Sequence, residues 1–553
     1  MSMFCYQCEQ TAQGTGCTSV GICGKTPETS TLQDVMVYII KGISQYANRA
    51  RALGKVDDTI NKVTLEALFM TLTNVNFDEH EHISYINEKL SPALEKAKNL
   101  YLDACKEKSG TAERLIGPAE WRGVTRSGLE LGEFGDAIGI LERSKSTPPD
   151  IVSLQELLTY GIKGLAAYAH HAQLLGYSDD EIFAFVHKAF DYLTSAEQSM
   201  PELLQLCLDA GKVNFLVMQL LDKAHTESFG NPEPTAVRIT PVSGKALLVS
   251  GHDLKSLFEL LKQTEGKGIN VYTHGELLPA HGYPGLKKFK HLVGNYGGAW
   301  QNQVKEFEEF PGAIIMTTNC LKPPAESYKK RLFTMDVVGW NDVPKIHNYD
   351  FAPAIKAALA APGFDRDEEK QEITVGFGHA AVLGVAGKVI ELVKAGKISH
   401  FYLIGGCDGA EFSRNYFTEF AEAVPADGVI MTLGCGKYRF NFKDFGSIEG
   451  IPRLLDIGQC NDAYSAVKIA SALADAFGCG INELPLSLII SWFEQKAVAV
   501  LLCLLYLGVK NIRLGPNLPA FVTPAVLNVL VENYGLKPVA TPKQDIEKIL
   551  QKV

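Results

Sequence analysis

The pattern of apolar residues changes near residue 225, and this change constrains the fold more than any other feature of the sequence. From residue 32 to about residue 221, apolar residues recur every three or four positions, which is the period of helices with one buried face. After the turn-rich segment 226–244, short apolar runs alternate with helical stretches. Such alternation is typical of parallel sheets covered by helices. The sequence therefore predicts a helical part followed by an α/β part.

The helical part contains an internal repeat. Residues 32–54 align without gaps to residues 154–176, an offset of 122 positions. The identical pairs include Gln33/Gln155, Tyr38/Tyr160, Lys41/Lys163, Gly42/Gly164, Tyr46/Tyr168 and Gly54/Gly176. Two repeats are too few for a solenoid. We interpret them as two related helical bundles, joined through the proline-containing stretch 144–150.

Six apolar runs in the second part are expected to form buried strands: residues 246–250, 270–273, 313–317, 401–404, 429–433 and 486–490. Residues 254–263, 382–394 and 497–507 are expected to be helices. The charged stretch 365–372 indicates a boundary between two α/β domains, although an exposed loop inside one domain would look the same. The expected domains are therefore residues 1–225, 226–370 and 371–553. Nucleotide binding is unsupported, because the sequence has neither a P-loop nor a GxGxxG turn after a strand.

Composition and charge exclude several classes of protein. A net charge of −10 disfavours a nucleic-acid partner. The longest apolar run, residues 497–509, is too short to span a bilayer, and no signal peptide opens the chain, so we expect a cytoplasmic protein. The twelve cysteines are too sparse for a disulfide scaffold in a chain of 553 residues. In a reducing compartment, clustered cysteines indicate metal binding or catalysis.

Four of the cysteines lie close together near the N-terminus, spaced C-x2-C-x8-C-x5-C: Cys5, Cys8, Cys17 and Cys23. Four thiolates are what a [2Fe–2S] or [4Fe–4S] cluster requires. Zinc is the main alternative, because structural zinc sites also use four thiolates. Those sites usually contain two C-x2-C pairs, however, and only one is present here. The motif therefore favours iron–sulfur binding over zinc or unbound thiols.

A second set of ligand-type residues follows the six predicted strands: His252, Glu276, Cys320, Cys407, Cys435 and Glu494. A seventh, Cys460, follows a shorter apolar run. In open α/β sheets, ligands bind beyond the carboxyl ends of the strands. Each residue alone has a structural explanation, such as a buried cysteine or an acid at a helix N-terminus. Their recurrence predicts one site of mixed sulfur, nitrogen and oxygen ligands suited to iron. The other cysteines lack this context and are expected to be structural: Cys105, Cys207, Cys479 and Cys503.

Together these motifs resemble those of the hybrid cluster protein family, also called prismane proteins or hydroxylamine reductases. The matching segments are FCYQCEQTAQGTGC, SGHDLK, VYTHGE, TTNC, GGCDG, GCGKYR, DIGQCND and SWFEQKAVAVLL. The resemblance covers essentially the whole chain. It implies a helical domain of two related three-helix bundles followed by two Rossmann-like α/β domains with mainly parallel sheets, a fold related to nickel-containing carbon monoxide dehydrogenases.

The resemblance also implies two cofactors. One [4Fe–4S] cluster would be bound by Cys5, Cys8, Cys17 and Cys23, because their spacing resembles that of the subgroup found in anaerobes. One hybrid [4Fe–2O–2S] cluster would be bound by His252, Glu276, Cys320, Cys407, Cys435, Cys460 and Glu494, with Cys407 as a persulfide.

The implied activity is reduction of hydroxylamine to ammonia and water, with electrons from a donor protein relayed by the N-terminal cluster. Glu276, Glu494 and Cys407 are expected to be catalytic. Lys496 and His274 are weaker candidates for a proton donor, and packing roles would explain them equally well. The alternatives are reduction of nitric oxide under nitrosative stress, and a signalling protein that transfers NO to the thiols of other proteins. The expected partners are a small nitrogen oxide and a redox protein, without nucleic acid or membrane.

Overall fold

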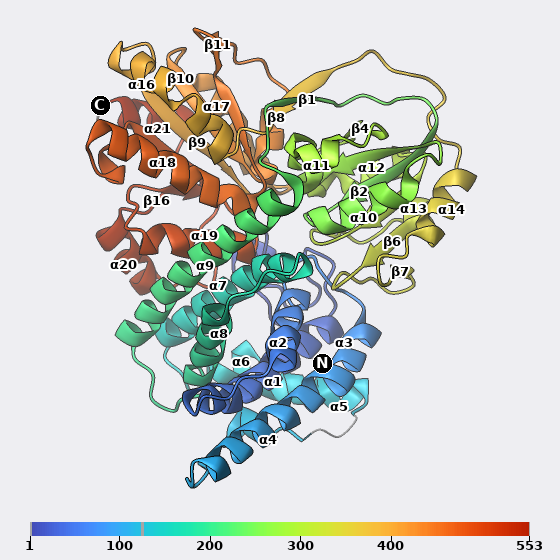
Figure 1. The fold of residues 1–553 in the computed structure, drawn as a ribbon. Coiled ribbons are helices and arrows are strands. Elements are labelled where there is room, and N and C mark those ends of the chain that lie inside the picture. The colour runs from blue at the N-terminus through green and yellow to red at the C-terminus, as the bar shows by residue number, and fades with distance from the viewer. Residues whose placement is uncertain (1–2, 123–125, 552–553) are drawn as a thin grey trace.

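A computed structural model describes residues 3–122 and 126–551 (Figure 1). Only helices and short helical turns precede the first strand among these residues. The α-helices of this part are α1 (Pro27–Ala52), α2 (Asp58–Met70), α3 (Glu79–Tyr85), α4 (Ser91–Glu107), α5 (Gly128–Ile138), α6 (Ile140–Arg143), α7 (Pro149–Leu174), α8 (Asp180–Tyr192) and α9 (Met200–Phe229). The predicted change from helices to strands is confirmed, although α9 continues eight residues beyond 221.

The two repeat segments begin within α1 and α7, which are both 26 residues long, and end two residues beyond them. After each helix a glycine has positive φ, 83° at Gly54 and 86° at Gly176. This backbone conformation disfavours residues with a side chain, which explains why both repeats end in glycine. The shared sequence therefore encodes the same helix with the same ending. Whether each helix heads a three-helix bundle stays a prediction.

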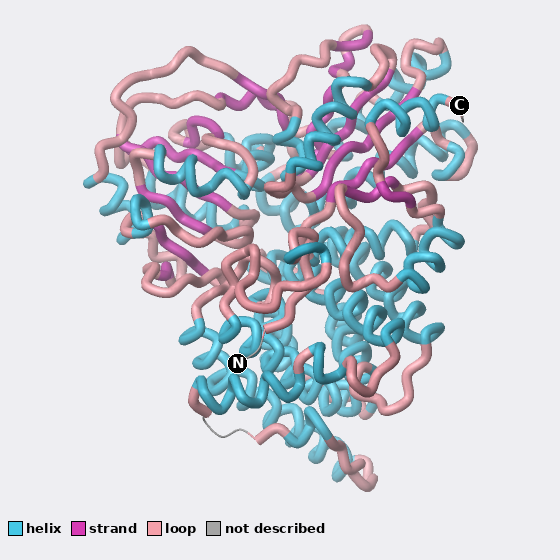
Figure 2. Tube along the Cα trace, turned by 180° about the vertical axis from the view of Figure 1, so that it is seen from behind, coloured by secondary structure: helices cyan, strands magenta, loops and turns pink. Residues whose placement is uncertain are grey.

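The second part contains two parallel sheets of six strands each, with orders β4-β3-β2-β5-β6-β7 and β13-β10-β9-β14-β15-β16. The first sheet consists of β2 (Lys245–Ser250), β3 (Ile269–His274), β4 (Leu292–Asn295), β5 (Ala313–Met316), β6 (Leu332–Met335) and β7 (Lys345–Ile346). The second consists of β9 (His400–Gly406), β10 (Gly428–Leu433), β13 (Leu454–Gly458), β14 (Leu486–Ser491), β15 (Arg513–Gly515) and β16 (Lys537–Pro538). All six predicted strands are confirmed. Figure 2 shows the strands gathered in one half of the molecule and the purely helical region in the other.

Helices accompany both sheets. The helices between and after the strands of the first sheet are α10 (Leu254–Thr264), α11 (Pro284–Lys287), α12 (Gln303–Glu309), α13 (Glu326–Lys329) and α14 (Ala352–Ala360). The second has α15 (His379–Gly384), α16 (Ala386–Lys394), α17 (Asn415–Ala423), α18 (Ala463–Phe477), α19 (Gln495–Tyr506), α20 (Pro524–Tyr534) and α21 (Pro542–Leu550). The prediction of one continuous helix over 382–394 is wrong, because the chain turns at Val385. The segment is divided there between α15 and α16.

The charged stretch before residue 372 leads into a small antiparallel ladder. There β8 (Glu372–Val375) pairs with β1 (Thr235–Arg238), so the chain returns after the first sheet to the strand that precedes it. A short hairpin of β11 (Ser447–Ile448) and β12 (Ile451–Pro452) lies between β10 and β13. The expected boundaries at 225/226 and 370/371 stay predictions.

The apolar helix α19 packs directly against the helical part. A Cβ atom at Gly164 of α7 would lie 2.2 Å from the carbonyl oxygen of Gln495, and one at Gly211 of α9 would lie 2.1 Å from that of Leu502. Backbones that touch this closely leave no room for a side chain. The helical part thus fixes the position of α19, including the residue before it, Glu494.

One helix of the described residues, α9, is long and apolar enough to cross a membrane by length and composition. Half of its most apolar window is buried inside the protein, where the helix packs against α7 and α19. This burial is what a core helix of a folded protein shows.

Substitution of Gly164 by alanine tests the contact between α7 and α19. We expect Gly164→Ala to destabilise the protein by about 1–3 kcal/mol, because the added methyl group forces the two backbones apart. The matched control is Gly387→Ala in α16, where a Cβ atom would meet nothing within 4 Å. That control should gain up to about 1 kcal/mol from helix propensity. Chemical denaturation of both variants distinguishes the two effects, and equal stabilities would contradict the contact.

Candidate functional site

The seven ligand-type residues predicted at strand ends come together. His252, Glu276 and Cys320 follow strands β2, β3 and β5 of the first sheet. Cys407, Cys435, Cys460 and Glu494 follow or end strands β9, β10, β13 and β14 of the second sheet. All seven line one pocket, together with Trp300, Asn319, Asp408 and Phe493. The carboxyl ends of the two sheets therefore face each other across a shared site.

Hydrogen bonds across the site hold the two sheets in register. The Nε2 atom of Gln459, after β13, donates to the carbonyl oxygens of His252 at 2.9 Å and Glu276 at 2.7 Å. The backbone N–H of Cys460 donates to Oε2 of Glu276 at 2.9 Å. The hydroxyl group of Tyr438 donates to the carbonyl oxygen of Gly275 at 2.8 Å. Side chains from the second sheet thus position the ligand-bearing loops of the first.

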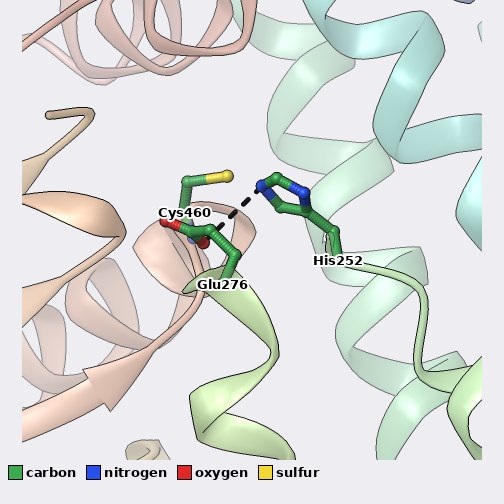
Figure 3. A group of neighbouring side chains, drawn as sticks. All are labelled: His252, Glu276 and Cys460. Carbon is green, nitrogen blue, oxygen red and sulfur yellow. Dashed lines mark hydrogen bonds and ion pairs between the residues drawn. The ribbon is translucent and has the colours of Figure 1, made fainter. Parts of the chain in front are cut away.

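Three of the seven offer ligand atoms that all lie within 4.8 Å of one another: His252, Glu276 and Cys460. Figure 3 shows these side chains pointing toward a common centre, with Nε2 of His252 3.8 Å from Oε2 of Glu276. The other ring nitrogen, Nδ1, is 2.9 Å from Oγ1 of Thr318, which leaves Nε2 facing the site. Burial, with a smaller effect of Lys496, lowers the pKa of His252 well below its ordinary value. A neutral imidazole is the form that binds metals.

Burial raises the pKa of every cysteine thiol in this pocket. The pKa of Cys407 rises to about 12, and the pKa values of Cys320, Cys435 and Cys460 are raised well above their ordinary range, with nearby carboxylates adding to the effect of burial. Four buried thiols beside two carboxylates do not readily lose their protons unless a strong positive charge lies between them. A cationic iron–sulfur centre supplies such a charge, so the donor set fits this group. The open space between these side chains is about 20 Å³. The side chains of His252 and Glu276 would therefore have to move apart to admit a cluster.

Lys496, one of the weaker candidates from the sequence, contacts residues of the site directly. Its Nζ atom lies 2.9 Å from Nε2 of His252, 2.9 Å from Oδ1 of Asn319 and 3.6 Å from Oε1 of Glu494. Burial alone would lower the pKa of Lys496, but the neighbouring Cys460 and Glu494 outweigh it and raise the pKa. Glu494 also caps α19, because its Oε2 accepts the backbone N–H of Lys496 at 2.8 Å. The ammonium group therefore stays charged inside the pocket.

The N-terminal cysteines form a compact loop. Cys5 and Cys17 exchange backbone hydrogen bonds at 3.0 and 2.8 Å. Two donors point at sulfur atoms: the N–H of Ala12 is 3.4 Å from Sγ of Cys17, and Nζ of Lys25 is 3.9 Å from Sγ of Cys5. The hydroxyl group of Thr11 donates to the carbonyl oxygen of Cys5 at 2.9 Å and lies 3.7 Å from Sγ of Cys17. Donors around sulfur stabilise thiolate charge and are typical of iron–sulfur ligands.

The cysteine loop packs against the second site. Cys8 lies in a buried cluster with Trp300, Phe493 and Cys435, and the rings of Trp300 and Phe493 are 4.5 Å apart between centroids. The N–H of Glu9 donates to the carbonyl oxygen of Phe493 at 2.9 Å. Two sites that lie far apart in the sequence are therefore joined by packed aromatic side chains.

A buried ion pair secures this junction. Nη2 of Arg414 is 2.8 Å from Oε2 of Glu9, and both side chains are completely inaccessible to solvent. The same guanidinium group donates to Oγ of Ser491 at 2.7 Å and to the carbonyl oxygen of Trp492 at 2.8 Å. Arg414 thus ties the N-terminal loop to the end of β14.

Other predicted residues lie outside the pocket. Cys105, Cys207 and Cys503 are buried in α4, α9 and α19, and Cys479 follows α18. His274 is fully buried and held by Oγ of Ser250 at 2.8 Å and Oε2 of Glu306 at 2.9 Å, so it is a structural histidine. The site residues that sequence reasoning missed are Asn319, Gln459, Arg414, Lys25 and Trp300. Only Asn319 and Gln459 could have been suspected, because each directly precedes a predicted cysteine ligand.

An apolar cavity of about 530 Å³ reaches the site from the surface. Its lining includes Cys407 and Cys460 at the site and exposed residues such as Lys510 and Asn511 at the surface. Between them the wall is mainly aliphatic, from α18, β14 and α19, and includes Ala466. Small uncharged molecules can therefore reach the two cysteines along a largely apolar wall.

The sequence model described as the Prismane/CO dehydrogenase family matches residues 3–547. The chain belongs to this family. It is 55% identical to a hydroxylamine reductase of Geobacter metallireducens, covering 100% of both chains. It is 52% identical to a hydroxylamine reductase of Syntrophobacter fumaroxidans, covering 99% of this chain and 100% of that one. The resemblance drawn from the motifs is thus confirmed.

Solved structures of the same fold are carbon monoxide dehydrogenases. The enzyme IV of Carboxydothermus hydrogenoformans superposes with a TM-score of 0.55 at 15% identity, over 99% of this chain and 92% of that one. A nickel-free enzyme from Thermococcus sp. AM4 superposes with a TM-score of 0.54 at 18% identity, over 98% of this chain and 90% of that one. At these identities the likeness establishes the multidomain α/β fold of this Prismane/CO dehydrogenase family member and nothing about its chemistry.

Removal of Arg414 tests the junction between the N-terminal loop and the second sheet. We expect Arg414→Met to destabilise the protein by about 3–5 kcal/mol, because Glu9 is left charged and buried. The double variant Glu9→Gln, Arg414→Met should recover part of this loss. Thermal unfolding of the single and double variants measures both effects. A single variant as stable as the parent chain would show that the ion pair does not hold the loop.

Proposed function

We propose that this chain is a hydroxylamine reductase that uses two iron–sulfur centres. The convergence of seven ligand-type side chains from two sheets on one pocket carries the proposal. The names of relatives more than 50% identical over nearly the full chain support it. The substrate is hydroxylamine, which takes up two electrons and two protons to give ammonia and water. A redox protein supplies the electrons, and the chain acts in the cytoplasm.

The N-terminal loop would hold a [4Fe–4S] cluster through Cys5, Cys8, Cys17 and Cys23. The pocket between the sheets would hold a hybrid [4Fe–2O–2S] cluster through His252, Glu276, Cys320, Cys407, Cys435, Cys460 and Glu494, with Cys407 as a persulfide. When bound, the hybrid cluster supplies electrons and a Lewis-acidic iron to the N–O bond. Four of these residues have identified surroundings: Glu276 accepts the N–H of Cys460, Glu494 accepts Nδ2 of Asn319, and Cys407 and Cys460 line the apolar cavity.

The chain's own groups would provide the protons. Lys496 holds a proton on Nζ inside the pocket, where Asn319 orients it by accepting a hydrogen bond at 2.9 Å. Burial raises the pKa of Glu494, although Lys496 opposes this effect, so Glu494 is a second candidate to carry a proton. Glu276 is fixed by the N–H of Cys460, which keeps its carboxylate directed at the pocket. Together these residues can bind, orient and protonate a small substrate.

Electrons would enter through the N-terminal loop. Its Cys8 shares a buried cluster with Trp300, Phe493 and Cys435. Continuous packing of this kind is a short route between the two proposed centres. The net charge of −10 gives no further indication of the donor protein.

The apolar cavity favours an uncharged substrate. Neutral hydroxylamine fits it, whereas its protonated cation would lose hydration along an aliphatic wall. Nitric oxide is also small and uncharged, so its reduction is the second candidate function. Steady-state rates with each molecule at low concentration distinguish the two.

Replacing one ligand tests the pocket. We expect Cys435→Ala to lower hydroxylamine turnover on the order of a hundredfold or more, since it removes a direct ligand where even indirect supports are worth that much. Consumption is measured anaerobically with reduced viologen, together with iron analysis and EPR. The matched control, Cys503→Ala, removes a buried thiol in α19 that does not line the pocket, and should keep activity and iron. Full turnover in Cys435→Ala would refute the assignment.

Narrowing the apolar cavity tests the substrate route. We expect Ala466→Phe to lower kcat/KM for hydroxylamine by about tenfold, or about 1.4 kcal/mol, without changing the EPR signals. The control Ser471→Phe places the same ring on the exposed face of α18, outside the cavity wall. If both variants keep the parent kcat/KM, the substrate enters elsewhere.

A further inference from the structure

The two repeats of the helical part face each other across a second cavity of about 320 Å³. Four equivalent pairs, each related by the offset of 122 positions, line it: Asp34/Glu156, Val37/Thr159, Tyr38/Tyr160 and Lys41/Lys163. Each of the helices α1 and α7 thus contributes an acid, a tyrosine and a lysine to the same space. The pocket proposed for catalysis uses none of these residues.

Two more cations break the balance of charge in this cavity. Arg143, at the end of α6, and Lys25, before α1, also line the wall. The two acids and two lysines of the repeats cancel one another, so Arg143 and Lys25 leave a surplus of positive charge. Lys25 contacts Sγ of Cys5 at 3.9 Å and belongs to the cysteine loop. Arg143 is paired with Glu156, so the remaining surplus falls on the two lysines of the repeats.

The cationic side chains of this cavity differ in whether an anionic group pairs with them. Arg143 pairs with Oε1 of Glu156 at 2.5 Å. Nζ of Lys163 has only neutral acceptors, Oε1 of Gln7 at 3.3 Å and the carbonyl oxygen of Thr71 at 3.5 Å. For the ammonium group of Lys41, no hydrogen bond or ion pair is found within residues 3–122 and 126–551. Burial lowers the pKa of Lys41 and the pKa of Lys163 to about 8. Asp34 and Glu156 act on both ammonium groups, but neither carboxylate forms an ion pair with them. Buried ammonium groups without a direct anionic partner are costly, and a bound anion would offset that cost.

The geometry points to a small oxyanion of the phosphate or sulfate class, bound in this cavity between Lys41, Lys163 and Arg143. Lysine and arginine donors recognise oxyanions, and the hydroxyl group of Tyr38 adds a neutral donor. The volume has room for roughly ten water molecules, which is ample for a tetrahedral anion and its hydration. Exposed Ala137 lies in the wall, so the cavity opens to solvent between α5 and α6.

The anion would also act on electron entry. Cys5 lines the same cavity, so negative charge bound there lies beside the proposed N-terminal centre and makes its reduction harder. This consequence rests on the proposed function, because it requires a cluster in the cysteine loop. Binding of the anion does not.

Equilibrium dialysis of radiolabelled inorganic phosphate against anaerobic holoenzyme tests the binding. We expect one saturable site per chain, weakened on the order of tenfold in Lys41→Met and restored in Lys41→Arg. The milder variant Tyr38→Phe keeps every charge and should also weaken binding. The matched control is Lys62→Met, which removes an equal charge from the exposed face of α2.

Two results would overturn the proposal: no saturable phosphate binding to the parent chain, or equal affinities for Lys41→Met and Lys62→Met. The midpoint potential of the N-terminal centre, followed by EPR with and without phosphate, is the second readout. The midpoint potential should fall with phosphate in the parent chain, and Lys41→Met should need about tenfold more phosphate for the same fall. Saturable binding to a chain without an N-terminal iron signal would uphold the anion site and contradict the proposed function.

Discussion

Two parallel sheets that meet at their carboxyl edges determine the rest of the structure. In a parallel sheet every strand ends on the same side, so the residue after each strand is delivered to one edge. With two sheets facing each other, ligand-type residues from seven strands share a volume that neither sheet could enclose alone. The backbone must turn sharply there. At Gly406, with φ of 114°, a Cβ atom would lie 2.0 Å from the carbonyl oxygen of Ser491, so only glycine fits.

The helical part supports the elements that carry this volume. Contact of α19 with α7 and α9 at Gly164 and Gly211 sets the position of Glu494 and Lys496, while the ion pair of Glu9 with Arg414 holds the cysteine loop against Phe493. Each contact joins segments hundreds of residues apart. Loss of either would therefore affect both the packing of the halves and the shape of the pocket.

Much of this could be predicted from the sequence, because buried parallel strands are continuous apolar runs and their carboxyl ends are where ligands collect. The six strands were found in that way, and so was the convergence of the seven ligand-type residues, which line one pocket. The place of Lys496 was not, because its contacts with His252 and Asn319 depend on how the sheets face each other. The break at Val385 was missed since the apolar period runs through it. The cavity between the repeats appears only when α1 and α7 are placed together, although their matching residues were visible in the alignment.

The contacts of the N-terminal loop also determine when it can be completed during synthesis. Gln7 accepts a hydrogen bond from Gln495 through its carbonyl oxygen, and Glu9 is held by Arg414 and by the backbone of Phe493. The ribosome makes the cysteine loop first, yet its anchors emerge more than four hundred residues later. The four thiols therefore lack the packing contacts of the finished loop during nearly the whole of translation. The loop can make these contacts only after Arg414 and Gln495 have been synthesised, so its final packing depends on nearly the whole chain.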